Sequence, residues 1–547
     1  MPLRPYSRLF AFVLSTASLL LPGARLLAQE APQTPQKAAS ANGSPPDHFQ
    51  VEQQKSQSSV TVDGRMIDYE AVAGNLVVHP KDWDDVPQNA DKDDKKGPPE
   101  ASMFYVAYFG KDGKEGKPSS SRPITFLFNG GPGSSTVWLH MGAFGPRRVL
   151  TANDSHTPAA PYRIVNNGYS LLDASDLVFV DAPGAGFSRI SGKDKEKAFY
   201  GIDADAQAFA DFIPRFLSKY ERWNSPKFLF GESYGTTRNA VLINLLESEK
   251  SIDFNGVINL SQILFFGGSP DGADISPGND LPYELALPTY AATAWYHHAL
   301  APPERDLQSL LAEVQHYALN EYAVALQAGG SLDPAQRLVV ANKLHDYIGL
   351  PVDYILKANL RITGGEFSKA LQSTRDITVG RLDTRFSGPT IDPLSKEADY
   401  DPQSAALGSA YVAAFNQYAR TELKYGRDKT FKPYVEVWKQ WEFKHQPPGA
   451  PFPLPMTADV TSDLATAMKV NPRLKVMLNS GYFDLATPYF QGIYEMNHLP
   501  IPAALRSNIE LHFYDSGHMV YANEPSFKAL HSNVADFIRR ASSTDDR

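Results

Sequence analysis

The sequence predicts an α/β protein in which a mostly parallel central sheet has helices on both faces. Short apolar runs of strand length recur along the chain, and each ends in Asp, Gly or Asn. Longer amphipathic stretches with helical periodicity lie between these runs, which is the alternation expected of a parallel sheet with crossover helices. A third observation is a long segment, 269–446, that is rich in helix formers, Tyr and Pro. It predicts one large helical insertion between two core strands.

The individual elements follow from the same patterns. Apolar or alternating runs bounded by polar turns predict strands at 60–67, 69–78, 103–108, 124–128, 177–180, 227–230, 474–478 and 509–514. Amphipathic periodicity predicts helices at 204–220, 236–249 and 526–540, with Pro214 expected to kink the first.

The domain organisation is predicted from changes in composition. Residues 1–28 have the pattern of an export signal: Arg4 and Arg8 precede an apolar run, and Ala28 ends a cleavage-like site. An uncleaved membrane anchor is the alternative, but the apolar run is shorter than the roughly 20 residues that span a bilayer. Residues 29–50 predict a flexible linker, and the core is expected in two parts, 51–268 and 447–547, around the insertion.

Composition excludes several classes of function. The chain has 547 residues, of which 42% are hydrophobic and 21% charged, so it can bury a large core. Its formal net charge is −9, and no basic excess indicates a nucleic-acid partner. It has no cysteine, which excludes thiol catalysis, disulfides and cysteine-ligated metal centres.

The strongest local motif is Gly231-Glu-Ser-Tyr-Gly235, which stands between a predicted strand and a predicted helix. A serine on such a tight turn, called a nucleophile elbow, projects its hydroxyl above the sheet in the α/β-hydrolase fold. The flanking glycines let strand and helix approach closely, and the helix N-terminus favours developing negative charge. Ser233 is therefore the predicted nucleophile.

A serine nucleophile needs a base and an acid that orients the base. His518 follows a predicted strand near the carboxyl end of the chain, where this fold carries its catalytic histidine. Asp484 lies in the loop past the strand at 474–478, between serine and histidine in chain order. Asp181 and Asp515 compete for this role, but Asp181 precedes the serine and Asp515 is more suited to shaping the turn before His518.

Two backbone N–H groups are needed to stabilise an oxyanion. Tyr234, the residue after the nucleophile, supplies one. The second is expected from the early glycine-rich loop 128–135 (FNGGPGSS). A simple Gly-Pro turn is the alternative interpretation of this loop. A phosphate-binding loop is a third interpretation, but loop 128–135 lacks the Gly-Lys-Ser/Thr ending that such loops carry.

Together these motifs resemble the serine carboxypeptidase family, the carboxypeptidase Y-like peptidases. The matching pieces are Asn129-Gly-Gly-Pro-Gly-Ser-Ser135, Val180-Asp-Ala-Pro-Gly-Ala-Gly-Phe-Ser188, Gly231-Glu-Ser-Tyr-Gly235, Asp484 and Gly517-His-Met-Val520. The resemblance implies an α/β-hydrolase fold whose helical insertion caps the active site. It also implies that Gly131 N–H is the second oxyanion donor, and that Asn129, Gly130 and Glu232 hold the free α-carboxylate of a peptide.

The sequence also departs from the family pattern. Ala143 stands where several relatives carry a glutamate that pairs with the one matched by Glu232, and Tyr521 stands where proline is common. Because a carboxylic acid donates a hydrogen bond to a carboxylate only while protonated, substrate binding is expected to weaken as Glu232 ionises. The missing pair leaves the pH dependence open.

The predicted function is an exported serine-type carboxypeptidase that acts on peptides with a free carboxyl terminus through an acyl-serine intermediate. An esterase or acyltransferase on the same fold is the alternative, and a catalytically silent binding protein is a third. No metal or organic cofactor, no nucleic acid and no stable membrane insertion after signal cleavage are expected. The predicted location is the periplasm or the exterior, which the sequence does not separate.

Overall fold

The structure is a computed structural model that describes residues 48–81, 83, 97–111, 121–301 and 305–543. The predicted export signal and all but the last three residues of the predicted linker lie outside these ranges. None of the described helices is both long enough and apolar enough to cross a membrane.

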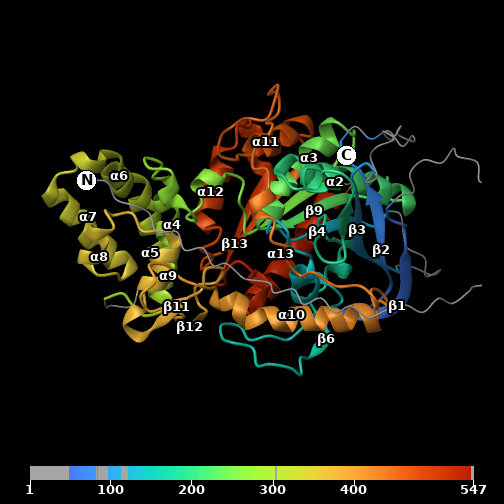
Figure 1. Ribbon diagram of the computed structural model, residues 1–547, viewed down its shortest axis with the longest axis horizontal. Coiled ribbons are helices and arrows are strands. Elements are labelled where there is room, and N and C mark those ends of the chain that lie inside the picture. Colours follow the sequence, from blue (N-terminus) through green and yellow to red (C-terminus); the bar gives the residue numbers. More distant parts are fainter. Residues whose placement is uncertain (1–47, 82, 84–96, 112–120, 302–304, 544–547) are drawn as a thin grey trace, which may run out of the picture. The chain divides into compact units, whose positions relative to one another are not determined.

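A ten-stranded sheet forms the centre of the described chain, in the order β1-β2-β3-β7-β4-β9-β10-β13-β14 with β8 on β3 (Figure 1). Its strands are β1 (Gln53–Val62), β2 (Arg65–Val78), β3 (Glu100–Gly110), β4 (Ile124–Phe128), β7 (Asp176–Val180), β8 (Arg189–Ser191), β9 (Lys227–Glu232), β10 (Gly256–Leu260), β13 (Lys475–Gly481) and β14 (Ile509–Tyr514). Strands β7, β4, β9, β10, β13 and β14 pair in parallel, and the first three strands pair antiparallel.

The strand order confirms the predicted α/β-hydrolase fold. Strand β7 lies between β3 and β4, although β4 precedes it in the chain, and β9, β10, β13 and β14 follow in order on the far side of β4. The carboxyl ends of β4, β9, β13 and β14 therefore lie along one edge, which is where ligands bind in open parallel sheets. The predicted glycine loop, nucleophile, acid and base follow these four strands.

Two sequence predictions about strands were incomplete or wrong. The expected strand at 60–67 is interrupted by a tight turn at Asp63 and Gly64, both with positive φ, so its two ends belong to the hairpin of β1 and β2. Strand β10 was not predicted at all, although it is fully buried between β9 and β13. Its run, Gly256–Leu260, contains the polar Asn259, which breaks the apolar pattern.

Helices cover both faces of the sheet. On one face, four helices share a hydrophobic cluster with the strands: α1 (Lys195–Phe199), α2 (Ile202–Lys219), α3 (Tyr234–Ser248) and α11 (Thr461–Val470). On the other face α13 (Glu524–Ser542), α10 (Pro402–Thr421) and the short π-helix η1 (Leu139–Phe144) share a second cluster. Helix α2 continues through Pro214 without a break.

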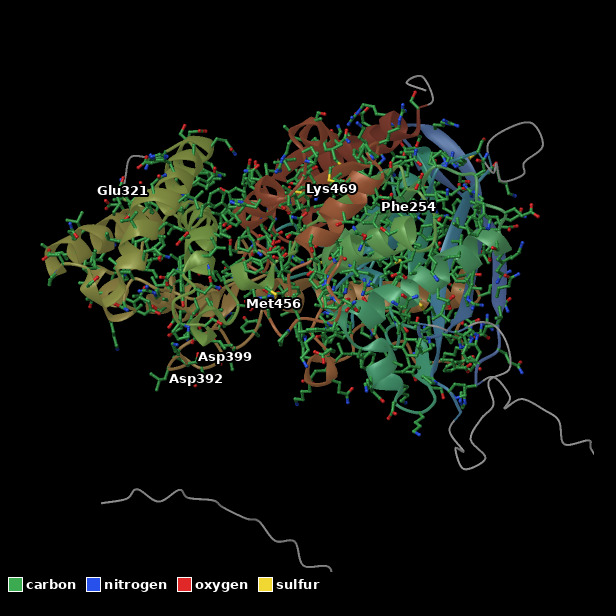
Figure 2. All side chains as sticks on the ribbon, turned by 90° about the horizontal axis from the view of Figure 1, so that it is seen from above. Phe254, Glu321, Asp392, Asp399, Met456 and Lys469 are labelled. Atoms are coloured by element: carbon green, nitrogen blue, oxygen red, sulfur yellow. The ribbon has the colours of Figure 1, made fainter. Side chains whose placement is uncertain are left out.

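The segment between β10 and β13 contains the predicted insertion. A separate hydrophobic cluster joins six helices of this segment: α4 (Leu281–Tyr296), α5 (Leu307–Tyr317), α6 (Ala323–Ala328), α7 (Pro334–Ile348), α8 (Val352–Lys357) and α9 (Gly364–Ala370). The same cluster includes residues of α12 (Tyr489–His498). Figure 2 marks Glu321 on this helical group, and Phe254 and Lys469 on the core. Helix α10 lies within the predicted cap, 269–446, but packs on the core rather than with α4–α9. The limits of the cap therefore stay a prediction.

Two small two-stranded ribbons lie outside the central sheet. Strands β5 (Arg147–Val149) and β6 (Ile164–Asn166) pair antiparallel, as do β11 (Ile377–Val379) and β12 (Ser387–Pro389). After α10 the chain crosses the core in an extended segment, 422–460, which forms isolated bridges to Ser134, Gly186, Gly201 and Phe265.

Candidate active site

Ser233 lies at the junction of β9 and α3 in a strained backbone conformation. Its φ is 61° and its ψ is −130°, a region that non-glycine residues rarely adopt. Close packing of strand and helix requires the glycine two residues earlier, since a Cβ on Gly231 would lie 2.1 Å from the carbonyl oxygen of Gly235. This is the geometry of a nucleophile elbow, and it presents Ser233 at the end of the strand.

Asp484 and His518 are hydrogen-bonded to each other. Asp484 Oδ2 lies 2.8 Å from His518 Nδ1, although the two residues come from loops after different strands. Asp484 is fully buried, and its Oδ1 accepts hydrogen bonds from the N–H groups of Ala486 and Thr487 at 2.9 and 3.0 Å. The Thr487 hydroxyl donates to Asp484 Oδ2 at 2.7 Å. These donors keep the carboxylate in one orientation, and it in turn orients the imidazole.

The electrostatics of His518 suit a general base held by a carboxylate. Burial on its own lowers the pKa of the imidazole, but the charge and hydrogen bond of Asp484 raise it, and the net pKa lies above its ordinary value. Ser233 and His518 line the same cavity of about 700 Å³. Within the described residues, Ser233 Oγ is not hydrogen-bonded to His518, a contact that commonly tightens only when substrate binds.

The predicted oxyanion donors lie at the meeting point of two loops. Gly130, Gly131 and Tyr234 all line the cavity. The glycine loop packs directly on the elbow, because a Cβ on Gly130 would lie 2.4 Å from the Tyr234 nitrogen. Gly131 has a φ of 107°, which favours glycine and turns the loop at this point. The glycine loop and the elbow thus line the cavity together with Ser233.

The residues predicted to hold a carboxylate form a buried cluster in the same cavity. Asn129 Nδ2 donates to Glu232 Oε2 at 2.9 Å, and both residues line the cavity. Asn129 is itself held by Leu139 N–H, which donates to its Oδ1, and by Arg238, which donates to its carbonyl oxygen. Burial raises the pKa of Glu232 to about 7, against the nearby charge of His518 and the donors that lower it. A carboxyl group of this kind is a hydrogen-bond donor at mildly acidic pH.

The competing acids serve other contacts. Asp181 accepts hydrogen bonds from the N–H and hydroxyl of Thr136 at 2.8 and 2.9 Å and from Phe187 N–H at 3.2 Å. It thus joins the loop after β7 to the glycine loop. Asp515 is exposed, and its carbonyl oxygen accepts a hydrogen bond from Arg385.

Several cavity residues were not predicted from sequence. Arg381 and Leu382, from the connection between β11 and β12, line the cavity beside His518, and Arg381 is paired with Asp271. An aromatic wall comes from Trp138, Phe266, Tyr434, Trp438 and Phe443. Most of these residues lie in irregular segments without a motif, so no local pattern marks them. In the described part of the chain, no group of three or more His, Asp or Glu side chains is arranged to hold a metal ion.

Fold and site together define a serine α/β-hydrolase geometry. The predicted resemblance to a particular family is confirmed: the model of the serine carboxypeptidase family matches residues 93–284. That segment includes the glycine loop and the elbow, and it ends before Asp484 and His518.

Two curated relatives agree with this family. A carboxypeptidase Y homolog of Arthroderma benhamiae is 30% identical over 156 residues, which cover 28% of each chain. Serine carboxypeptidase-like 33 of Arabidopsis thaliana is 28% identical over 165 residues, 28% of this chain and 30% of the relative. The matched part thus spans less than a third of either relative.

Solved structures align over most of the chain, but weakly. Proline iminopeptidase of Mycobacterium smegmatis is 13% identical with a TM-score of 0.31, covering 89% of this chain and 99% of its own. A peroxisomal α/β-hydrolase of Saccharomyces cerevisiae is 10% identical with a TM-score of 0.34, covering 90% of each chain. Because these scores are low, the fold assignment rests on the strand order and the elbow.

Proposed function

We propose that the protein is a serine-type carboxypeptidase that removes carboxy-terminal residues from peptides. One observation carries the proposal: the Asn129–Glu232 cluster opens into the same cavity as Ser233 and His518. A buried, protonated carboxyl beside an amide offers hydrogen-bond donors, and a charged free carboxylate accepts these bonds more strongly than the neutral carbonyl of an ester or amide end. The match to the serine carboxypeptidase family supports the same assignment.

In the proposed mechanism, His518 accepts the proton of Ser233 Oγ while this oxygen attacks the last peptide carbonyl. Asp484 keeps the His518 Nδ1 proton directed toward itself, so that Nε2 is free to act as base. The N–H groups of Gly131 and Tyr234 stabilise the tetrahedral oxyanion. The imidazolium then gives its proton to the leaving amine, and the terminal amino acid departs.

Water completes the cycle. His518 removes a proton from a water molecule that attacks the acyl-serine, a second tetrahedral intermediate forms, and the proton returns to Ser233 as the new carboxyl terminus leaves. Ser233, Tyr234, Gly131 and His518 line one cavity, and Asp484 is hydrogen-bonded to His518. No metal or organic cofactor takes part in the proposed cycle. If another nucleophile replaces water, the same acyl-enzyme gives the acyltransferase alternative.

Glu232 gives the proposed reaction a pH dependence. The substrate carboxylate is charged at neutral pH, so a neutral Glu232 donates to it while an ionised Glu232 repels it. Since burial raises the pKa of Glu232 to about 7, recognition of a free carboxyl terminus is expected to be strongest in acid and to weaken above neutrality.

The test is hydrolysis of an N-blocked dipeptide whose carboxyl terminus is either free or amidated. We expect a strong preference for the free acid, lost in Glu232→Ala, and no turnover of either substrate in Ser233→Ala. Equal cleavage of both forms, or action on simple esters alone, would replace the proposal by an esterase. Failure of a covalent serine probe to label Ser233 would instead support the catalytically silent alternative.

Export is a separate part of the proposal. It rests on the pattern of residues 1–28, which lie outside the described residues. Sequencing the amino terminus of the protein recovered from culture medium and from a periplasmic extract tests it. A processed amino terminus near Gln29 is expected, and an intact Met1 in both fractions would contradict signal cleavage.

A further inference from the structure

Glu232 has a second side-chain partner that belongs neither to the cavity wall nor to the glycine loop. The hydroxyl of Tyr521 lies 2.9 Å from Glu232 Oε2 and 3.2 Å from Oε1, and it donates to this carboxyl group. Tyr521 is buried, and it is absent from the residues that line the cavity. It therefore contacts Glu232 from behind, on the side away from the substrate.

The position of the Tyr521 hydroxyl is fixed by its surroundings. Tyr521 lies in the short 3₁₀-helix η10 (Val520–Ala522), three residues after His518. Its ring packs against the backbone of Gly142, where an added Cβ would lie 2.8 Å from Tyr521 and 2.5 Å from Tyr411. Burial raises the pKa of Tyr521 well above its ordinary value, so the phenol stays protonated and remains a donor.

A donor in this place stabilises one protonation state of Glu232 over the other. Hydrogen bonds to a carboxylate favour its charged form and lower its pKa, whereas burial disfavours that form. Asn129 and Tyr521 are the two side chains that hydrogen-bond to Glu232 among the described residues. Of these, Asn129 faces the cavity, so Tyr521 can be altered with the least change to the substrate contacts.

Other titratable groups also act on Glu232. His518 lowers its pKa when charged, and Asp484 raises it. Burial, together with the charge of Glu232, raises the pKa of Tyr411 on α10, so Tyr411 stays uncharged, while Arg381 lowers the pKa of His518. Removing one uncharged hydroxyl at position 521 leaves all of these charges in place.

Glu232 and His518 line the same cavity, and the charge of each shifts the pKa of the other. A neutral imidazole with a protonated Glu232 is the productive state, and an imidazolium with an ionised Glu232 carries the same number of protons but is unproductive. Macroscopic titration steps belong to the pair. A donor that favours the ionised Glu232 therefore shifts the pair toward the unproductive state near neutral pH.

From this geometry we propose that Tyr521 is a positioning residue that controls the ionisation of Glu232 and thereby the highest pH at which a free α-carboxylate is recognised. The inference rests on the proposed function, since it concerns the regulation of the same site. Ala143 has no polar side chain that could pair with Glu232. The proposal assigns that contact to Tyr521 instead.

The test is the pH dependence of kcat/KM for the free-acid dipeptide in Tyr521→Phe. Loss of one hydrogen bond to a charged group corresponds to about one pH unit, so the alkaline limb should move up by about that amount. One unit above the wild-type midpoint, kcat/KM should then rise about fivefold. Tyr411→Phe, which removes a neighbouring buried hydroxyl that does not contact Glu232, is the matched control and should leave the limb in place.

Two further variants make the result decisive. Glu232→Gln, always a donor, should lose the alkaline limb, and adding Tyr521→Phe to it should cause no shift. In a Ser233→Ala background, the affinity for the free-acid dipeptide should show the same shift without any contribution from turnover. If Tyr521→Phe fails to fold, Tyr521→Met removes the donor in a flexible apolar side chain.

The outcomes separate the inference from the proposed function. An unmoved limb in Tyr521→Phe, with the limb abolished in Glu232→Gln, would overturn the role of Tyr521 and leave the carboxypeptidase assignment intact. A wild-type protein that labels at Ser233 but shows no preference for the free acid would overturn both.

Discussion

Asp383 accepts a hydrogen bond from the backbone N–H of Gly517, the residue before His518, at 3.0 Å. In the same segment the carbonyl oxygen of Leu382 accepts a hydrogen bond from His518 N–H at 2.6 Å. Asp383 is fully buried and paired with Arg385, which also donates to the carbonyl oxygen of Asp515 at 3.0 Å. The segment between β11 and β12 therefore holds the backbone of the candidate base.

Asp383→Asn is expected to lower both stability and activity. It leaves Arg385 buried without its ionic partner, which costs about 3 kcal/mol in the free energy of unfolding. We also expect kcat to fall more than KM rises at temperatures where the variant stays folded, because the loop carrying His518 loses an anchor. Denaturant unfolding and steady-state kinetics measure the two effects.

An exposed ion pair provides the control for Asp383. Arg540 and Asp536 are paired at 2.7 Å on α13, with side chains 56% and 62% exposed. Asp536→Asn should cost less than about 1 kcal/mol and leave kcat unaffected. Equal stability losses in the two variants would contradict the structural role of Asp383.

The order of the catalytic groups could be predicted from sequence because each lies directly after a recognisable strand. Ser233, Asp484 and His518 each follow an apolar run, and the parallel sheet brings the ends of these runs to one edge. Their roles still await the experiments above. Strand β10 escaped prediction because the polar Asn259 interrupts its apolar run.

The contacts that surround the candidate triad could not be predicted, because they join residues far apart in the chain. Tyr521 and Glu232 are separated by 289 positions, and Asp383 and Gly517 by 134. Neither pair lies in one helix or strand, so no period links them. Such contacts depend on how distant parts of the chain pack together, which propensity and local pattern do not encode.

Asp484→Asn is expected to lower kcat by about 10⁴-fold with little change in folding, because an amide at this position leaves His518 in the wrong tautomer. Steady-state kinetics on the free-acid dipeptide measure this. Asp515→Asn is the matched control, since Asp515 is exposed three residues before His518 and was the competing candidate. A larger loss in Asp515→Asn than in Asp484→Asn would reverse the assignment of the acid.

A buried histidine outside the site is expected to make stability depend on pH. His445 lies between two carboxylates, with Nδ1 2.5 Å from Asp203 and Nε2 2.8 Å from Asp463. Burial lowers the pKa of His445, but the two carboxylates raise it, to about 9. Burial also raises the pKa of Asp463, so the cluster titrates as a unit.

The sign of this effect follows from the raised pKa of His445. The ordinary pKa in an unfolded chain is about 6.5, so the stabilisation is complete below that pH and is lost as pH rises through about 9. The loss amounts to about 3 kcal/mol at most. His445→Gln should flatten the free energy of unfolding between these pH values. A variant that keeps the wild-type slope would show that His445 is not the source.

The aromatic wall of the cavity is expected to select large apolar side chains in the substrate. Trp438 donates to the Tyr434 hydroxyl at 2.8 Å, and its ring stacks on Phe443 at 5.6 Å. Phe443 in turn meets Phe266 edge to face at 5.9 Å. These contacts order the rings before substrate arrives, so a bulky apolar side chain can displace water from a preformed surface.

Trp438→Ala should therefore change the choice of substrate more than the rate of the chemistry. We expect kcat/KM to fall about 10- to 100-fold for a dipeptide that carries phenylalanine next to the scissile bond. For a dipeptide with alanine at the same position, kcat/KM should fall much less. Trp223→Ala is the matched control, because Trp223 is 48% exposed and does not line the cavity. A uniform loss for both substrates in Trp438→Ala would mean that the wall supports the fold of the cavity rather than its specificity.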